Sequence, residues 1–270
     1  MRLNTMESNL ETDAPQRWVG TSPEGLASAM VLAAGRGERM RPLTDTAPKP
    51  MLKVHGKPLM QWHMEALAKA GHPDQLINTA WLGPQIEAHF GLNPDLPNGG
   101  RVRLRYSHEG KEFGYALETA GGIVRALPFL APVFWVVAGD IYAPQFDFAP
   151  AIAKEFVRSD KLAHIWLVPN PAHNPKGDFG LSSEGLALNL PKTATLFTFS
   201  TLALYKKEFF AAALTGMPEG NPQGKAAPLA PLLRAAMDRG LVSASLYTGA
   251  WTDVGTPERL RDLNQSPATP

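Results

Sequence analysis

The stretch MVLAAGRGERMRPLTDTAPKPML, residues 30–52, decides how the rest of this 270-residue chain is interpreted. It begins in a short apolar run stopped by glycine, which is typical of a strand buried on both faces. A Gly-x-Gly turn follows, and such a turn lets the backbone approach a phosphate or a base closely while it offers free N–H donors. The stretch therefore predicts a buried strand that leads directly into an anion-binding loop.

Basic residues support that interpretation. Residues 36–57 contain six basic and two acidic side chains, a local excess of four positive charges, and prolines stiffen the segment around Lys49. The dinucleotide-binding fingerprint needs a third glycine where this chain has Met40, and the Gly-Lys-Ser/Thr of a Walker loop is absent. A solvated, proline-rich surface loop is the alternative. The buried strand, the glycine turn and the excess of positive charge together favour a polyanionic ligand such as a triphosphate.

Composition limits the function classes. A formal net charge of +1 creates no overall field for nucleic acid, and no apolar run reaches the length of a membrane span. The chain has no cysteine, which rules out a disulfide framework and a thiolate zinc site and fits a reducing cytoplasm. We therefore expect a cytoplasmic protein without a nucleic-acid or membrane partner.

Strand-like and helix-like segments alternate along the chain. PLMQWHMEALAKAG, residues 58–71, has apolar residues at helical spacing between a starting proline and a final glycine. VFWVVAGD, residues 133–140, reads as a buried strand that ends in Gly-Asp. The alternation predicts an α/β fold, a Rossmann-like open mixed and mostly parallel sheet with helices on both faces. Such sheets bind ligands beyond the carboxyl ends of their strands, where AAGRG and AGD both fall.

The segments LAAGRGERMRPLT and PKPML together resemble the signature of the sugar-1-phosphate nucleotidyltransferases. INTAWLGPQIEAHFG, LETAGGI, VAGDIY and WTDVGTPERL agree with that family in type and order, so the resemblance covers roughly residues 29–260. NTAWLG, LETAGGI, NPAHNPKGDFGL and TFS make the chain most similar to the bacterial N-acetylmuramate α-1-phosphate uridylyltransferases of cell-wall recycling. Mannose-1-phosphate guanylyltransferases share much of this pattern and remain an alternative, as does a non-catalytic subunit that senses sugar nucleotides.

The resemblance implies one domain over residues 29–264, with a nucleotide-binding half (29–145) and a sugar-binding half (146–264). Residues 1–28 lack the apolar stretch of a signal peptide and are expected to form a poorly ordered extension, and residues 265–270 a tail. The implied substrates are a nucleoside triphosphate, with UTP favoured, and a sugar 1-phosphate, with N-acetylmuramate 1-phosphate favoured.

In this reaction a phosphate oxygen of the sugar 1-phosphate attacks the α-phosphorus, and pyrophosphate leaves. The attacking oxygen is already an anion, so the chemistry needs positioning and charge neutralisation rather than a general base. A hard divalent cation, Mg²⁺, suits that need. The family resemblance implies that Asp140 and Asp253 bind the metal and that Arg39 and Lys49 hold the triphosphate. An isolated Asp at a strand end is more often a turn former, but here two match at once.

The remaining site residues also come from the resemblance. The expected nucleotide-binding set is Ala33, Ala34, Gly35, Gly37, Ser107, Glu109, Thr119 and Gly121. The expected sugar-phosphate set is Asn170, Asp178, Ser200 and Lys225. A Glu-Lys-Pro segment that supplies a lysine in many family members is absent, and Lys225 is preferred to Lys192 as its replacement because it precedes PLAPLL. No histidine pair has the spacing of a helical zinc motif, and His63 is expected to be a packed or surface residue rather than a catalytic one.

Overall fold

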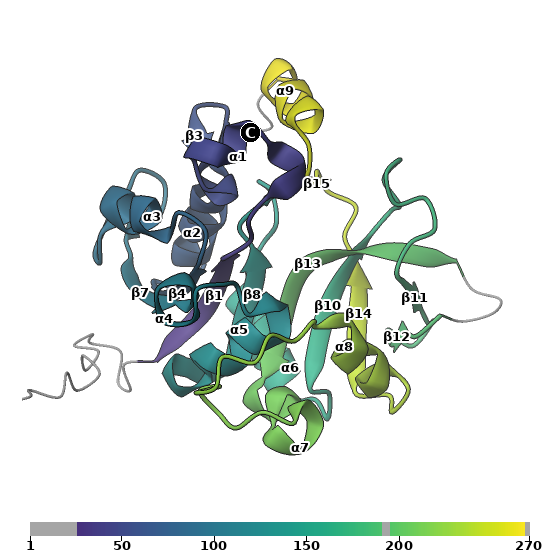
Figure 1. The fold of residues 1–270 in the computed structure, drawn as a ribbon. Coiled ribbons are helices and arrows are strands. Elements are labelled where there is room, and N and C mark those ends of the chain that lie inside the picture. The colour runs from purple at the N-terminus through teal and green to yellow at the C-terminus, as the bar shows by residue number, and fades with distance from the viewer. Residues whose placement is uncertain (1–25, 191–194, 268–270) are drawn as a thin grey trace, which may run out of the picture.

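The computed structural model describes residues 26–190 and 195–267, whose fold is drawn in Figure 1. Most of the predicted N-terminal extension, the end of the predicted tail and Lys192 lie outside the described residues. The first strand, β1 (Ala27–Ala33), contains the apolar run of the opening stretch. Among the described residues, no helix combines the length and the apolar character needed to span a bilayer.

A nine-stranded mixed sheet forms the centre of the molecule (Figure 1). Neighbouring strands are parallel through β8-β1-β4-β7, and the long strand β13 is antiparallel to β8, β10 and β11. The predicted α/β class with an open mixed sheet is confirmed. Besides β1, the strands of this sheet are β4 (Asp74–Thr79), β7 (Arg103–His108), β8 (Leu130–Ala138), β10 (Ala163–Val168), β11 (Phe179–Leu181), β12 (Ala187–Leu188), β13 (Leu196–Lys206) and β14 (Val242–Leu246).

Helices cover both faces of the sheet, as predicted. Side chains alternate along β1, so Met30 and Val31 enter different apolar cores. Helices α5 (Glu118–Ala126) and α8 (Ala230–Met237) pack on the Met30 side. The Val31 side is covered by α2 (Leu59–Lys69), α3 (Gly83–Phe90) and α6 (Pro150–Arg158), and α2 is the helix predicted within residues 58–71.

Shorter elements carry the loops at the sheet edge. The short helices are α1 (Leu43–Thr46), α4 (Glu109–Phe113), α7 (Ala212–Thr215), α9 (Pro257–Gln265), η1 (Glu38–Met40), η2 (Lys49–Met51), η3 (Leu127–Phe129) and η4 (Lys207–Phe210). The small strand pairs are β2 (Lys53–Val54) with β3 (Lys57–Pro58), β5 (Asp95–Leu96) with β6 (Gly100–Arg101), and β9 (Ile141–Tyr142) with β15 (Thr252–Asp253).

The pairing of β9 with β15 joins two distant parts of the chain beyond the end of β8. Asp253 lies opposite Ile141, and the N–H of Val254 donates to the carbonyl of Asp140 at 3.1 Å. A small apolar core lies beneath this pair and connects it to α9, to α2 and to the signature loop, residues 34–52. Figure 1 shows α9 and β15 at that edge of the sheet. The signature loop and the C-terminal region therefore form one packed unit.

A directional chain of hydrogen bonds fixes the ends of β1 and β4. The N–H of Ala33 donates to Oδ1 of Asn78 at 2.9 Å, and Nδ2 of Asn78 donates to Oε1 of Glu109 at 2.8 Å. The N–H of Leu117 donates to the other carboxylate oxygen at 2.7 Å. Burial raises the pKa of Glu109, while these two donors favour the ionised form. Because both neighbours donate, the position needs a group that only accepts.

Replacing Glu109 by Gln should destabilise the fold although the shape is kept. A glutamine NH₂ must face either Asn78 Nδ2 or the N–H of Leu117, so one buried donor loses its partner, at a cost of about 1–3 kcal/mol. Urea unfolding measures the change in the free energy of unfolding. The matched control is Glu112→Gln on the same helix, which removes a surface ion pair with Arg125 and should cost no more than about 1 kcal/mol. Equal effects from the two variants would contradict this role of Glu109.

His63 makes the stability dependent on pH. Its ring is buried in α2 and donates from Nε2 to the carbonyl of Ile141 at 2.8 Å, and burial lowers its pKa from 6.5 to about 4. The unfolded chain therefore binds this proton more tightly, so stability is lost as the pH falls from about 6.5 towards about 4. In His63→Gln the free energy of unfolding should fall less steeply as the pH is lowered, by up to about 1.4 kcal/mol per pH unit. Half-buried His164, whose pKa is also lowered to about 4, contributes equally to the parent and to the variant, so identical pH slopes would refute the assignment.

Candidate active site

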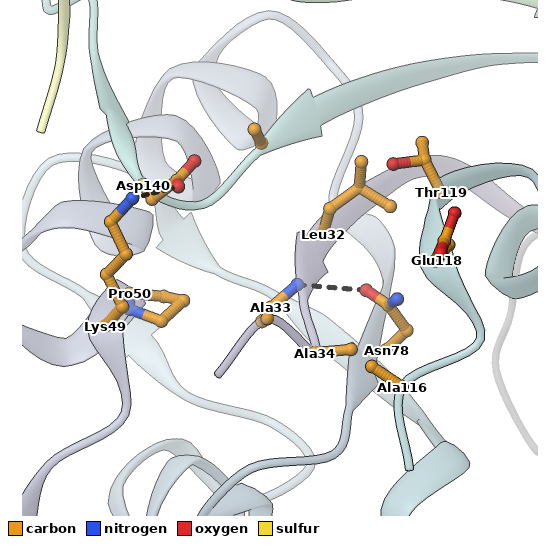
Figure 2. A pocket seen from close by; sticks show the side chains of 12 residues that line it. Leu32, Ala33, Ala34, Lys49, Pro50, Asn78, Ala116, Glu118, Thr119 and Asp140 are labelled. Atoms are coloured by element: carbon orange, nitrogen blue, oxygen red, sulfur yellow. Dashed lines mark hydrogen bonds and ion pairs between the residues drawn. The ribbon is translucent and has the colours of Figure 1, made fainter. Parts of the chain in front are cut away.

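A cavity of about 310 Å³ opens at the carboxyl edge of the parallel strands, where the sequence placed the ligand site (Figure 2). Its lining residues are Leu32, Ala33, Ala34, Gly35, Lys49, Pro50, Asn78, Ala116, Glu118, Thr119, Ala138 and Asp140. In Figure 2 the backbone that follows β1 runs between Lys49 and Pro50 on one side and Asn78 and Ala116 on the other. The small side chains of Ala33, Ala34 and Gly35 let a flat ring approach this backbone closely.

The signature loop wraps a second part of the site. Gly37 has a positive φ of 69°, a conformation that favours glycine, and the turn is closed by a hydrogen bond from Oγ1 of Thr44 to its carbonyl at 2.9 Å. The guanidinium of Arg36 lies 3.7 Å from the centre of the Trp81 ring and also donates to the carbonyl of Thr44. A smaller cavity of about 230 Å³ lies inside this turn. It is lined by Gly35, Gly37, Glu38, Arg39, Met40, Lys49, Asp140 and Gly255.

The three arginines of the signature loop differ in their partners. Arg36 and Arg41 both form ion pairs with Asp45. Arg39 lines the smaller cavity, and within the described residues its side chain has no ion pair or hydrogen bond. Its charge is thus the one that the loop itself leaves uncompensated, which suits an anionic ligand.

Lys49 and two aspartates meet where the first and the smaller cavity join. The ammonium of Lys49 forms an ion pair with Oδ2 of Asp140 and lies 4.0 Å from Oδ1 of Asp253. The Lys49 residue is only 8% exposed. Asp253 therefore lies at the same edge of the sheet as Asp140, and the pairing of β9 with β15 brings it there.

Asp253 is held by two further side chains. Nη1 of Arg259 donates to its Oδ2 at 2.9 Å and to its carbonyl at 2.7 Å. Nε2 of His173 lies 3.4 Å from the same Oδ2, and burial together with neighbouring Arg259 lowers the pKa of His173. A Cβ at Gly255 would come within 2.6 Å of Arg259, so glycine at this position makes the contact possible. Arg259 and His173 thereby fix the orientation of the Asp253 carboxylate.

The donor set fits one hard cation. Within the described residues, no group of three or more His, Cys, Asp or Glu side chains has the arrangement of a metal site. Oδ1 of Asp140 and Oδ1 of Asp253 accept no hydrogen bond there, because the side-chain hydrogen bonds of both carboxylates go to Oδ2. Oδ1 of Asp253 lies 4.0 Å from the Lys49 ammonium. Mg²⁺ usually takes one or two carboxylates and completes its shell with water and phosphate oxygens. Two carboxylates beside a phosphate-sized cavity match that requirement.

A larger cavity of about 540 Å³ continues from the first one. Both are lined by Leu32, Glu118, Thr119 and Ala138, and the larger one extends between β13 and α8 to Arg234. Glu118 has a φ of 57° and Thr201, in the wall of the larger cavity, a φ of 63°. Non-glycine residues rarely adopt this conformation, and such strain concentrates at functional sites.

The structure brings together most of the predicted catalytic and nucleotide-side residues. Those lining one of the three cavities are Ala33, Ala34, Gly35, Gly37, Arg39, Lys49, Thr119 and Asp140. Ser107, Glu109 and Gly121 line none of them. Ser107 is buried in β7, Glu109 is bound by Asn78 and Leu117, and the N–H of Gly121 donates to the carbonyl of Ala227. Glu109 supports the cavity wall through Asn78, which lines the first cavity.

The side chains of three of the four residues predicted on the sugar side have hydrogen-bond partners within the protein. Asp178 lines the larger cavity, although its carboxylate already accepts from Asn174 and from the N–H of Phe199. Asn170 donates to the carbonyl of Leu196, and buried Ser200 donates to that of Trp166 at 2.7 Å, so both hold loops and strands together. Exposed Lys225 lines none of the three cavities.

Sequence reasoning missed several residues of the site. These are Asn78, Glu118, His173, Arg234 and Arg259. Asn78 was detectable as a polar residue at the end of a buried strand, and Arg259 lies within the matched segment WTDVGTPERL. Nothing in the local sequence distinguishes Arg234 from a surface arginine of an amphipathic helix.

Comparisons with known proteins agree with this arrangement. A family model described as nucleotidyl transferase matches residues 28–269. The N-acetylmuramate alpha-1-phosphate uridylyltransferase of Neisseria meningitidis is 43% identical over 236 residues, which is 87% of this chain and 95% of that protein. The protein of the same description from Caulobacter vibrioides is 30% identical, over 85% of this chain and 92% of that protein.

More distant relatives and solved structures match a smaller part of this chain or have a lower sequence identity to it. A mannose-1-phosphate guanylyltransferase catalytic subunit beta of Drosophila pseudoobscura is 32% identical over only 42% of this chain and 30% of its own length. The structure of a putative glucose-1-phosphate thymidylyltransferase from Bacillus anthracis superposes with a TM-score of 0.68 at 20% identity, over 88% of this chain and 94% of that one, and it shows the same fold. The chain therefore belongs to the nucleotidyl transferase family, the group of sugar-1-phosphate nucleotidyltransferases that its motifs indicated.

Proposed function

We propose that this enzyme transfers a uridylyl group from UTP to N-acetylmuramate α-1-phosphate and releases pyrophosphate, in cell-wall sugar recycling. The substrate assignment rests on the sequence identity of 43% to the N-acetylmuramate alpha-1-phosphate uridylyltransferase of Neisseria meningitidis, in an alignment that covers 95% of that protein. The guanylyltransferase match covers less than half of this chain, so GTP with mannose 1-phosphate is the weaker candidate. The cluster of Lys49, Asp140 and Asp253 beside the cavity supports the chemistry.

Residues 29–145 would bind the nucleotide, and residues 146–264 the sugar. The base would lie against the backbone of residues 33–35, with Asn78 and Thr119 at its edges. Ala33 donates its N–H to Asn78, so this part of the wall is already rigid before the ligand arrives. Rigid walls lower the cost of ordering the site on binding.

The signature loop would hold the triphosphate. Arg39 has no partner of its own within the described residues, and Lys49 lies between the nucleotide cavity and the two aspartates. Both cations would neutralise the α-phosphate and the leaving pyrophosphate while the anionic sugar phosphate attacks. No general base is required, so catalysis comes from positioning and electrostatic stabilisation. Arg259 and His173 act as positioning residues for Asp253.

Members of this family generally use a divalent metal, and we propose Mg²⁺ for this chain. When bound, the cation would offset charge that builds up between the two phosphates. Asp140 and Asp253 would hold it, each through the carboxylate oxygen that makes no hydrogen bond within the described residues. A cytoplasmic location follows as part of the proposal, because that is where nucleoside triphosphates are made.

The donor preference tests the substrate assignment. With N-acetylmuramate α-1-phosphate as acceptor, UTP should give a kcat/KM higher than those of GTP, ATP and dTTP by on the order of tenfold or more, because the rigid wall selects base size. Pyrophosphate release measures all four donors against a panel of sugar 1-phosphates. A higher kcat/KM for GTP with mannose 1-phosphate would replace this proposal by the guanylyltransferase alternative.

The aspartate pair tests the metal assignment. Asp140→Asn and Asp253→Asn keep the shape but remove one charge each, and each should lower kcat by on the order of 10²–10³. The double variant should lose little more, because both residues serve one ion. Titration with Mn²⁺, followed by electron paramagnetic resonance, should show weaker metal binding in each variant independently of turnover.

The control for this pair is Asp160→Asn, at a surface carboxylate that forms an ion pair with neighbouring Lys161. It should match the parent in both turnover and metal affinity. Turnover close to that of the parent in either folded single variant would refute the shared-ion assignment. Full additivity in the double variant would mean that the two carboxylates have separate roles.

A further inference from the structure

The larger cavity has one basic residue in its lining, Arg234 on α8. Most of the other lining residues are apolar, among them Phe179, Phe199 and Leu233. The cavity shares Leu32, Glu118, Thr119 and Ala138 with the nucleotide cavity, which contains Lys49 and Asp140. A ligand can therefore reach from the reaction centre into this space.

Arg234 has no carboxylate partner among the described residues. Its Nη1 donates to Oδ1 of Asn189 at 2.7 Å, and its Nη2 lies 3.5 Å from the carbonyl of Asp178. The guanidinium also lies 4.9 Å from the centre of the Phe179 ring. All three partners are neutral groups, so the positive charge is uncompensated and most of the five N–H donors of the guanidinium stay available.

The orientation of this guanidinium is fixed. Nδ2 of Asn189 donates to both carboxylate oxygens of Asp238, at 3.0 and 3.2 Å, so its Oδ1 faces Arg234. The side chains of Asn189 and Phe179 thus hold Arg234 from two directions. A half-buried guanidinium held in place next to apolar walls is well suited to a carboxylate, which it can bind through two parallel hydrogen bonds.

The acidic groups of the cavity do not fill that role. The carboxylate of Asp178 is bound by Asn174 and by the N–H of Phe199, and Glu118 lies at the junction with the nucleotide cavity. Neither of them forms an ion pair with Arg234 within the part of the chain that the structure describes. Arg234 thus has no direct anionic partner among the described residues, and a ligand that enters the cavity can supply one.

We propose that Arg234 binds a carboxylate on the sugar of the acceptor and makes the enzyme selective for an acidic sugar 1-phosphate. This inference rests on the proposed function, because N-acetylmuramate carries a lactyl ether with one carboxylate and one methyl group. The carboxylate binds the Arg234 fork, and the methyl group packs on Phe199 and Leu233. The 1-phosphate stays at the other end of the ligand, beside Lys49 and Asp140.

The test compares two acceptors that differ only in the lactyl group, N-acetylmuramate α-1-phosphate and N-acetylglucosamine α-1-phosphate. In Arg234→Met the KM for the first acceptor should rise about 10- to 100-fold, the loss typical of a charge-assisted hydrogen bond. The kcat/KM for the second acceptor and the KM for UTP should stay within about twofold, a change that corresponds to less than half of one such bond. Arg234→Lys, which keeps the charge but not the fork, should recover part of the discrimination.

A second variant covers the case in which Arg234→Met does not fold. Asn189→Ala leaves the guanidinium in place but removes its orienting partner, so it should raise the KM for N-acetylmuramate α-1-phosphate alone. Equal losses with both acceptors would overturn the inference and would mean that Arg234 binds the phosphate. Unchanged kinetics in folded Arg234→Met would overturn it as well. A parent enzyme that uses UTP with neither acceptor would instead refute the proposed function.

Discussion

The pairing of β9 with β15 is the contact on which the candidate site depends. Asp140 precedes β9 directly and Asp253 ends β15, so the antiparallel register sets the relation between the two carboxylates. More than a hundred residues separate them along the chain, and the buried side chains of Tyr142 and Val254 hold the two strands against the signature loop. Burying apolar side chains at this point stabilises an arrangement of like charges that would otherwise repel one another.

Opposite charge completes that arrangement. Buried Lys49 contacts Asp140, and Arg259 contacts Asp253, so each carboxylate has its own cation. The same cations and carboxylates are the groups that phosphate transfer needs, because the reaction joins two polyanions. Stability of the loop and competence of the site therefore rest on the same ion pairs. Arg39, which the fold leaves without an ion pair within the described residues, remains available for the ligand.

Much of this was predictable from sequence because the signals are local. The alternation of strand-like and helix-like segments predicted the α/β class, which is confirmed. The motif around Lys49 predicts a phosphate-binding loop, and that stays a prediction. Polar residues such as Glu109, Asn170 and Ser200 were expected to contact ligand, and in the structure each of them has a hydrogen-bond partner in the backbone. Asn189 and Arg234 meet only in the folded chain, across 45 positions, so no local pattern marks the second cavity. The sequence predicts that a buried polar group has a hydrogen-bond partner, but it does not identify that partner.

The most direct test of the account is a crystal structure of the enzyme with Mg²⁺ and a non-hydrolysable UTP analogue. In that structure uracil should lie against the backbone of residues 33–35, with the triphosphate running past Lys49 towards Arg39. The α-phosphate should lie beside Asp140 and Asp253. A nucleotide whose base occupies the larger cavity next to Arg234, with its phosphates away from the two aspartates, would contradict it.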